Sequence, residues 1–201
     1  MARQGYNEGC LAAHALDLLG DRWAILVLRE LMLGPKRFGA IKAGLPGIAS
    51  NVLTQRLQDL AAAGLLMRDE TGYALTAAGR EARPVIDALC RWGVRQPGHD
   101  PRKFISPVSL MLSLAVMYRP GDRVLTAGFD LGTERFAARA GPEGFAVRPC
   151  PEALGDMVFS GDANAMAVAF YGPQPLAAAP VGFRGDPGDG QALVDRFVLG
   201  R

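Results

Sequence analysis

Apolar positions in the first half of the chain recur with the period of short helices. The first stripe, at i, i+4, i+7 and i+8, is formed by Leu11, Ala15, Leu18 and Leu19. It predicts a helix that ends at Gly20. The next run, WAILVLRELML, is apolar nearly all round, as in a helix at the centre of a small domain, and Asp21 can cap it. After Gly34-Pro35, a short helix is expected over about 38–45.

The segment 50–63 is predicted to be a helix with two unlike faces. Leu53, Leu57 and Leu60 recur on one side. Short polar side chains point the other way, namely Asn51, Thr54, Gln55 and Gln58. A glycine, Gly64, then suits the C-terminal cap. Such a helix packs one face on its own domain and presents hydrogen-bonding groups on the other.

A hairpin and a long helix complete the first half. LLMRDE and YALT read as two strands around a Thr71-Gly72 turn. The following helix, over about 77–95, can be capped by Thr76, and Pro84 should kink or split it. Helix, short helix, glycine-containing turn, polar-faced helix, hairpin and helix form the order of a winged helix-turn-helix, mostly α with a β-hairpin wing.

The pattern changes after a stretch rich in proline and glycine. We therefore expect two domains, 1–97 and 104–201, joined by a linker at 98–103. The second domain opens with an apolar helix at about 106–118. Alternating segments then predict a three-strand meander, a fourth strand, a helix, a fifth strand and a closing helix. This order indicates an α+β domain with an antiparallel sheet of about five strands.

Composition and charge limit the classes of function without identifying one. The formal net charge is only +2; residues 1–97 carry a small basic excess and residues 98–201 a small acidic one. The three cysteines are widely spaced, with no CxxC pair and no Cys/His cluster, so neither a metal site nor a disulfide framework is expected. No signal peptide is recognisable, and the apolar stretch 107–118 is too short to span a membrane. We expect a soluble, cytoplasmic protein without a cofactor.

The polar face of the 50–63 helix suits DNA because bases in the major groove are read by short hydrogen-bonding side chains. Basic residues at its borders suit phosphate contacts, and Arg68 on the hairpin suits a wing beside the minor groove. Arg56 can reach a base or a phosphate. The predicted DNA contacts are Lys36, Arg37, Ser50, Asn51, Thr54, Gln55, Arg56 and Arg68. Each could instead be an ordinary solvated side chain.

Residues 10–93 resemble the HxlR family of winged-helix regulators. The resemblance rests on an N-terminal cysteine followed by ALDLLGDRW, LRELMLGPKRF, LPGI, LTQRLQDLAAAGL, YALTAAGR and RPV, in order and without gaps. It implies a homodimer that binds a palindromic operator on double-stranded DNA and pairs through the first and last helices of the domain. Two departures are Cys10-Leu11 and Ala49-Ser50, where the family often has Cys-Pro and Ser-Pro. With the second change, Ser50 is expected to take the helix cap.

Cys10 has two interpretations. Some relatives use a cysteine near this position to sense oxidants or electrophiles, which requires an exposed, thiolate-prone sulfur. Its place just before a helix would lower its pKa. A small apolar residue in a dimer interface needs no such chemistry.

The second half carries no catalytic constellation, and we do not expect an enzyme. Its order of elements resembles the sterol carrier protein type of lipid-binding domain, in phrases such as TAGFDLGTERFAARAGPEGFAV and MVFSGDANAMAVAFYG. The resemblance implies an apolar tunnel under the sheet for a hydrophobic small molecule. The expected lining residues are Leu114, Met117, Phe129, Phe145, Phe159, Met166 and Phe170. The same residues could simply fill a core.

Together these patterns predict a DNA-binding transcription regulator, acting as a repressor and as a homodimer on a two-fold operator. The second domain would sense a hydrophobic effector or support the dimer. The alternative is a lipid or metabolite carrier with a residual DNA-binding module; an enzyme whose catalytic groups escape notice is a third. The intact polar face at Asn51, Thr54 and Gln55 favours the regulator, since a carrier has no need of it.

Overall fold

The computed structural model describes residues 5–199 and divides the chain into two compact units, Met1–Ile86 and Asp87–Arg201. The predicted linker, 98–103, lies within the second unit, in a stretch without helix or strand. Within residues 5–199, no helix is both long and apolar enough to cross a membrane.

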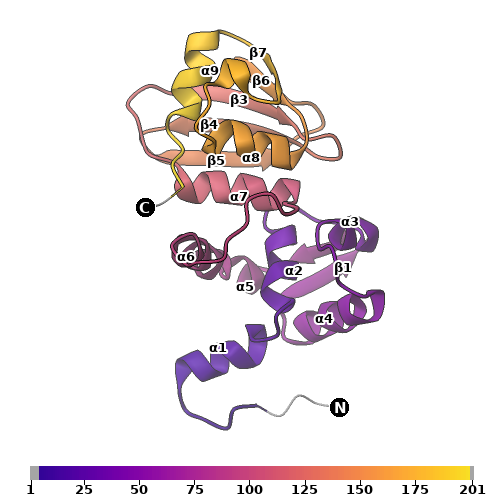
Figure 1. Cartoon of the computed structure of the whole chain (residues 1–201). Coiled ribbons are helices and arrows are strands. Elements are labelled where there is room, and N and C mark those ends of the chain that lie inside the picture. Colours follow the sequence, from indigo (N-terminus) through magenta and orange to yellow (C-terminus); the bar gives the residue numbers. More distant parts are fainter. Residues whose placement is uncertain (1–4, 200–201) are drawn as a thin grey trace. The chain divides into compact units, whose positions relative to one another are not determined.

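The first unit has the element order that the sequence predicts (Figure 1). The two strands form an antiparallel hairpin, which α2, α4 and α5 contact. Its elements are α1 (Leu11–Leu19), α2 (Ala24–Leu31), α3 (Phe38–Ala43), α4 (Ser50–Ala62), β1 (Leu66–Asp69), β2 (Gly72–Leu75), α5 (Ala77–Arg80) and α6 (Arg83–Gly93), which runs past the division.

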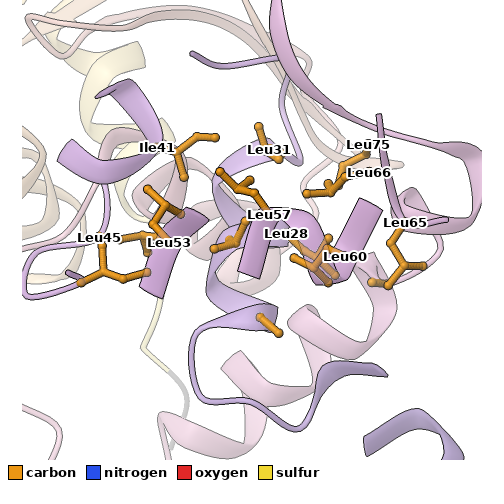
Figure 2. Close-up of a cluster of buried hydrophobic side chains, with 14 residues drawn as sticks. Leu28, Leu31, Ile41, Leu45, Leu53, Leu57, Leu60, Leu65, Leu66 and Leu75 are labelled. Carbon is orange, nitrogen blue, oxygen red and sulfur yellow. The ribbon is translucent and has the colours of Figure 1, made fainter. Parts of the chain in front are cut away.

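The core of this unit is an aliphatic cluster built around α2 (Figure 2). Val27 and Leu28 are completely buried, which agrees with a helix that is apolar nearly all round. The buried face of α4 joins them, as do α3 and the hairpin. At about 1.5–3 kcal/mol for each fully buried aliphatic side chain, this cluster supplies the main favourable term that holds α4 in place.

Both ends of α4 are defined by backbone geometry. Ala49 occupies the N-cap position, with extended dihedrals and no side-chain cap, and Ser50 is the first helical residue. The expectation that Ser50 caps the helix is therefore wrong. At the other end, the N–H of Leu65 bonds to Leu60 O and the N–H of Gly64 to Ala61 O. This Schellman pair needs Gly64 at φ +73°, as the sequence predicts.

The wing is a tight hairpin that a third segment joins. Its turn is Glu70-Thr71 rather than the expected Thr71-Gly72, because Asp69 pairs with Gly72 and accepts the N–H groups of both Thr71 and Gly72. Lys36 and Tyr73 exchange two backbone hydrogen bonds beside it. A side chain at residue 72 would meet Lys36 O at 2.4 Å, so only glycine allows this approach.

One helix boundary differs from the sequence expectation, and another agrees with it. The α2 helix begins at Ala24 with Trp23 in the cap position, and Asp21 accepts the N–H of Trp23. Asp21 thus caps the turn that leads into α2 instead of the helix itself. The long C-terminal helix is split into α5 and α6, as Pro84 predicts, and Thr76 caps α5 by accepting the N–H of Gly79.

The second unit is an α+β fold with a five-stranded sheet in the order β5-β4-β3-β6-β7. Helices α7, α8 and α9 pack together against the sheet (Figure 1). Its elements are α7 (Pro107–Met117), β3 (Leu125–Asp130), β4 (Arg135–Gly141), β5 (Gly144–Pro149), β6 (Met157–Ser160), α8 (Ala163–Tyr171), the 3-10 helix η1 (Leu176–Ala178), β7 (Gly182–Arg184) and α9 (Pro187–Val194).

The sheet is mixed, so the expectation of a purely antiparallel sheet is wrong. Strand β6 pairs with β3 in parallel, whereas the other neighbours are antiparallel. After β5, at the edge of the sheet, the chain returns across β3. The close approach is visible at Gly128, where an added Cβ would lie only 2.6 Å from the carbonyl carbon of Ala153. Because that crossing brings the chain back to the starting end of β3, β6 enters in the same direction as β3.

Candidate nucleic-acid interface

The two faces of α4 are as unlike in the structure as in the sequence. Leu53, Leu57 and Leu60 are buried in the core cluster. The polar side chains opposite them are all exposed, namely Asn51, Thr54, Gln55 and Gln58. The helix therefore presents uncharged donors and acceptors on a rigid, well-packed support.

Hydrogen bonds within α4 already orient two of these side chains. The Thr54 hydroxyl donates to the Ser50 carbonyl at 2.9 Å, and the Gln55 amide nitrogen donates to Asp59 Oδ1 at 2.8 Å. Asn51 has no side-chain hydrogen bond to any residue among 5–199. An amide group with free donors and acceptors is suited to bidentate contact with a base edge.

Arg56 is held by the protein itself. Its Nη1 lies 3.3 Å from Asp21 Oδ2 and 3.1 Å from Asp59 Oδ2, and the side chain is only 17% exposed. The guanidinium thus ties α4 to the turn before α2. In this arrangement it does not extend from the polar face, although it was predicted to contact DNA.

Lys36 also has a carboxylate partner. Glu30 on α2 is completely buried and binds Lys36 Nζ at 3.3 Å and Arg29 Nη2 at 2.9 Å. Gly44, after α3, packs on the same carboxylate: a Cβ there would lie 2.3 Å from Glu30 Oε2. The Glu30 carboxylate therefore fixes α2, the strand-like segment at residue 36 and the end of α3 together.

Sequence reasoning missed Glu30 as a structural residue. The available signal was an acidic side chain inside a run that is otherwise almost wholly apolar. Burying a charge is costly unless it is paired, so an acid in such a run implies basic partners nearby.

The remaining predicted DNA contacts are exposed. Arg37 lies just before α3, and Arg68 lies on β1 with its guanidinium carbon 5.5 Å from the centre of the Tyr73 ring. Ser50 is exposed at the start of α4 and accepts a hydrogen bond from Lys42 Nζ at 2.6 Å. That bond places a positive charge at the N-terminal end of α4, where the helix dipole also favours an anion such as phosphate.

Cys10 is exposed at the N-cap position of α1. The backbone N–H groups of Ala13 and Ala12 lower the pKa of its thiol, although the thiol makes no full capping hydrogen bond. This arrangement suits the redox interpretation of Cys10, which stays a prediction.

The residues predicted to line a tunnel in the second unit are packed against one another. Phe129 stacks on Phe159 with ring centres 5.4 Å apart, and both rings contact Phe170. Phe129 also contacts Phe145 edge-on at 6.3 Å. Leu114, Met117 and Met166 are buried as well. Of the seven predicted lining residues, only Phe170 borders any of three sizeable surface cavities of this unit.

No group of three or more His, Cys, Asp or Glu side chains that could hold a metal ion occurs among residues 5–199. What stands out in the first unit is instead the supported polar helix beside a two-stranded wing. Helices, polar helix and wing together define a winged helix-turn-helix, a module that places its recognition helix in the major groove.

Comparison with known proteins gives the family. The model of the HxlR-like helix-turn-helix matches residues 18–100. The chain belongs to this family of helix-turn-helix DNA-binding transcription regulators.

The relatives include three uncharacterised HTH-type transcriptional regulators. One from Synechocystis is 42% identical, and the match covers 42% of this chain and 67% of that protein. One from Methanothermobacter thermautotrophicus is 34% identical, and the match covers 45% of this chain and 75% of that protein. YvaP from Bacillus subtilis is 35% identical, and the match covers 39% of this chain and 79% of YvaP. The crystal structure of quinone-bound YodB from B. subtilis has 33% identity and a TM-score of 0.40, covering 42% of this chain and 97% of that one.

Proposed function

We propose that this protein represses transcription by binding a specific double-stranded DNA operator, with α4 as the recognition helix. The observation that carries the proposal is the exposed, uncharged polar face of α4 opposite a buried leucine face. Base edges in the major groove are discriminated by such hydrogen-bonding side chains, and membership of the HxlR-like family supports the same placement.

The side chains divide into three roles. Asn51 and Gln55 read bases, because an amide can contact adenine through two hydrogen bonds. Arg37 and Arg68 contact phosphates and the minor groove beside the wing. Arg56 keeps α4 oriented through its carboxylate partners, and its release toward DNA would cost that support.

The active species is proposed to be a homodimer on a two-fold operator. The α6 helix leaves Val85, Leu89 and Trp92 exposed, with Trp92 at 59%, and α1 leaves Leu11 and Leu16 exposed. Exposed apolar side chains clustered on one helix mark an interaction surface. A second copy is the simplest partner for these helices, because a two-fold dimer reads two half-sites about 34 Å apart.

The second unit is proposed to support the dimer or to sense an effector. Cys10 is a candidate sensor of oxidants or electrophiles in this scheme. The rival proposal of a carrier with a residual DNA module gains no support from α4, whose polar face would then have no use.

Binding-site selection on random double-stranded DNA tests the proposal. The full chain should enrich a two-fold sequence, and the double variant Asn51→Ala/Gln55→Ala should lose base preference, at a cost of about 1–3 kcal/mol for each lost base contact. Gln174→Ala, which removes an exposed amide in the second unit, is the matched control and should select the wild-type sequence. If the double variant selects the same sequence with the same affinity, α4 is not the recognition helix.

The oligomeric state tests the second part of the proposal. Light scattering of the full chain at micromolar concentration should give the mass of a dimer, and Leu89→Ser/Trp92→Ser should shift it to a monomer. A wild-type monomer that stays monomeric on DNA would refute the dimer.

A further inference from the structure

The second unit contains a cavity that neither the DNA-binding face nor the predicted tunnel explains. Its volume is about 710 Å³, within the range of small-molecule sites. One wall is the chain segment 98–105, and the others are Ser109 and Ser113 on α7 together with Val168 and Tyr171 on α8. It lies outside the packed phenylalanine core described above.

The wall formed by residues 98–105 is fixed to α8. Asn164, in the first turn of α8, donates to the Lys103 carbonyl at 2.8 Å and accepts the N–H of Ile105 at 3.2 Å. Directly after it, Ser106 caps α7 by accepting the N–H of Ser109. The cavity is therefore held open by specific hydrogen bonds, as in a pre-formed site, instead of being a gap between loose loops.

A pair of hydroxyl groups lines this cavity. Ser113 Oγ and Tyr171 Oη lie 2.8 Å apart, and either can be the donor. Two hydroxyls carry two O–H hydrogens, and their mutual bond uses one. Within residues 5–199 neither group has another hydrogen-bond partner, so one O–H remains available for an acceptor in the cavity. Burial raises the pKa of Tyr171, which keeps the phenol protonated and able to donate at neutral pH.

The charges of the lining favour an anion. His99 and Lys103 are the basic residues of the cavity, and Asp100 is its one acidic residue. Both carboxylate oxygens of Asp100 are already bound by Arg102, at 2.9 and 3.2 Å. Arg102, Lys103 and His99 all interact with this one carboxylate and lower the pKa of Asp100, so basic groups outnumber acidic groups at the cavity.

The rest of the lining is mostly apolar. Phe104 is 54% exposed and Val168 49% exposed, although both are large hydrophobic residues. An occupant that covers them would gain about 25 cal/mol for each Å² of apolar surface removed from water.

From these features we infer that the cavity between residues 98–105, α7 and α8 binds a small apolar carboxylic acid. Its ring or chain lies on Phe104 and Val168, and its carboxylate accepts the free O–H of the Ser113–Tyr171 pair in the field of Lys103. None of the predicted DNA contacts lines the cavity, so ligand binding can be tested separately from the proposed function.

The test is isothermal titration of the full chain with two probes that share one ring system. 2-Naphthoate should bind at one site per chain, whereas the cation 2-naphthylmethylammonium should not bind. Tyr171→Phe removes one oxygen and should weaken naphthoate about tenfold, the value of one hydrogen bond to a charged group. Lys103→Gln should also weaken it severalfold. The control Arg148→Gln removes an exposed positive charge elsewhere in the unit and should bind like the wild type.

Three outcomes would overturn the inference. The first is no binding of naphthoate to the wild type, and the second is equal binding of the cationic probe. The third is unchanged affinity in both Tyr171→Phe and Lys103→Gln, which would place the probe at another site. Amide hydrogen exchange of each variant checks that the unit is folded.

Discussion

Phe159 should behave as a core residue, and its truncation measures whether the second unit is filled. The side chain lies on β6, which pairs with the central strand β3, and it is completely buried. Its ring contacts three other rings, those of Phe129, Phe170 and Phe183, at centre distances of 5.0–5.4 Å. Phe→Ala in a close-packed core costs about 3–5 kcal/mol. Because Phe159 also makes three ring contacts, each worth about 0.5–1.5 kcal/mol, we expect the stability lost in Phe159→Ala to lie toward the upper end of this range.

Hydrogen exchange of β3 and β6 amides in the full chain provides the assay, because it reports on this unit separately from the first. The expected result is a loss of 3–5 kcal/mol in the free energy of opening for these strands. Phe159→Leu keeps most of the volume and should lose clearly less. A loss below about 1.5 kcal/mol for Phe159→Ala would refute the packed core and return Phe159 to the wall of a tunnel.

Three further predictions concern the first unit. Glu30→Ala should lower the free energy of unfolding of this unit by about 3 kcal/mol in denaturant unfolding, because Lys36 and Arg29 lose their buried partner. Glu30→Gln should lower it less. Equal losses of stability in the two variants would contradict the ionic role of Glu30. Gly64→Ala should cost about 1–2 kcal/mol at φ +73°, whereas Gly39→Ala, in α3 with open space around it, should be neutral or stabilising in the same assay. Hydrogen bonds from Thr71 lower the pKa of Asp69, so the carboxylate's contribution to the stability of the first unit is present above about pH 4 and is lost as pH falls through the lowered pKa. The difference in thermal midpoint between wild type and Asp69→Asn should therefore shrink as pH falls below about 4. A difference that stays constant with pH would contradict this stabilising role of the carboxylate.

Much of the first unit could be predicted because local rules and packing agree in it. The leucine spacing of α4, the positive-φ glycine after it and the proline between α5 and α6 each act within a few residues. The ion pairs of Arg56 and Lys36 could not be predicted in this way. Apart from the i,i+3 pair of Arg56 with Asp59 inside α4, they join groups that come together only when the helices pack. A basic side chain at a helix border looks the same in the sequence whether its partner is a phosphate or a carboxylate.

In the second unit, the elements followed from the sequence but their neighbours did not. The alternation of apolar and polar residues predicts the strand β6 but does not show which strand pairs with it. The parallel pairing of β6 with β3 depends on the crossing of residues 150–156 over Gly128. The cavity was missed for a similar reason. Ser113 and Tyr171 are 58 residues apart in the sequence, and neither segment alone indicates that their hydroxyl groups will form a hydrogen bond.

The engagement of Lys36 and Arg56 by carboxylates has a consequence for how DNA affinity responds to ionic strength. Each phosphate neutralised by a protein cation releases condensed counterions, and log K then falls with log [salt] by about 0.9 for each such contact. Of the four basic residues predicted to contact DNA, only Arg37 and Arg68 have no carboxylate partner within residues 5–199. In the proposed complex these two residues would contribute a slope of roughly −2 per chain instead of roughly −4. A larger share of operator affinity would then come from uncharged hydrogen bonds, which salt does not screen.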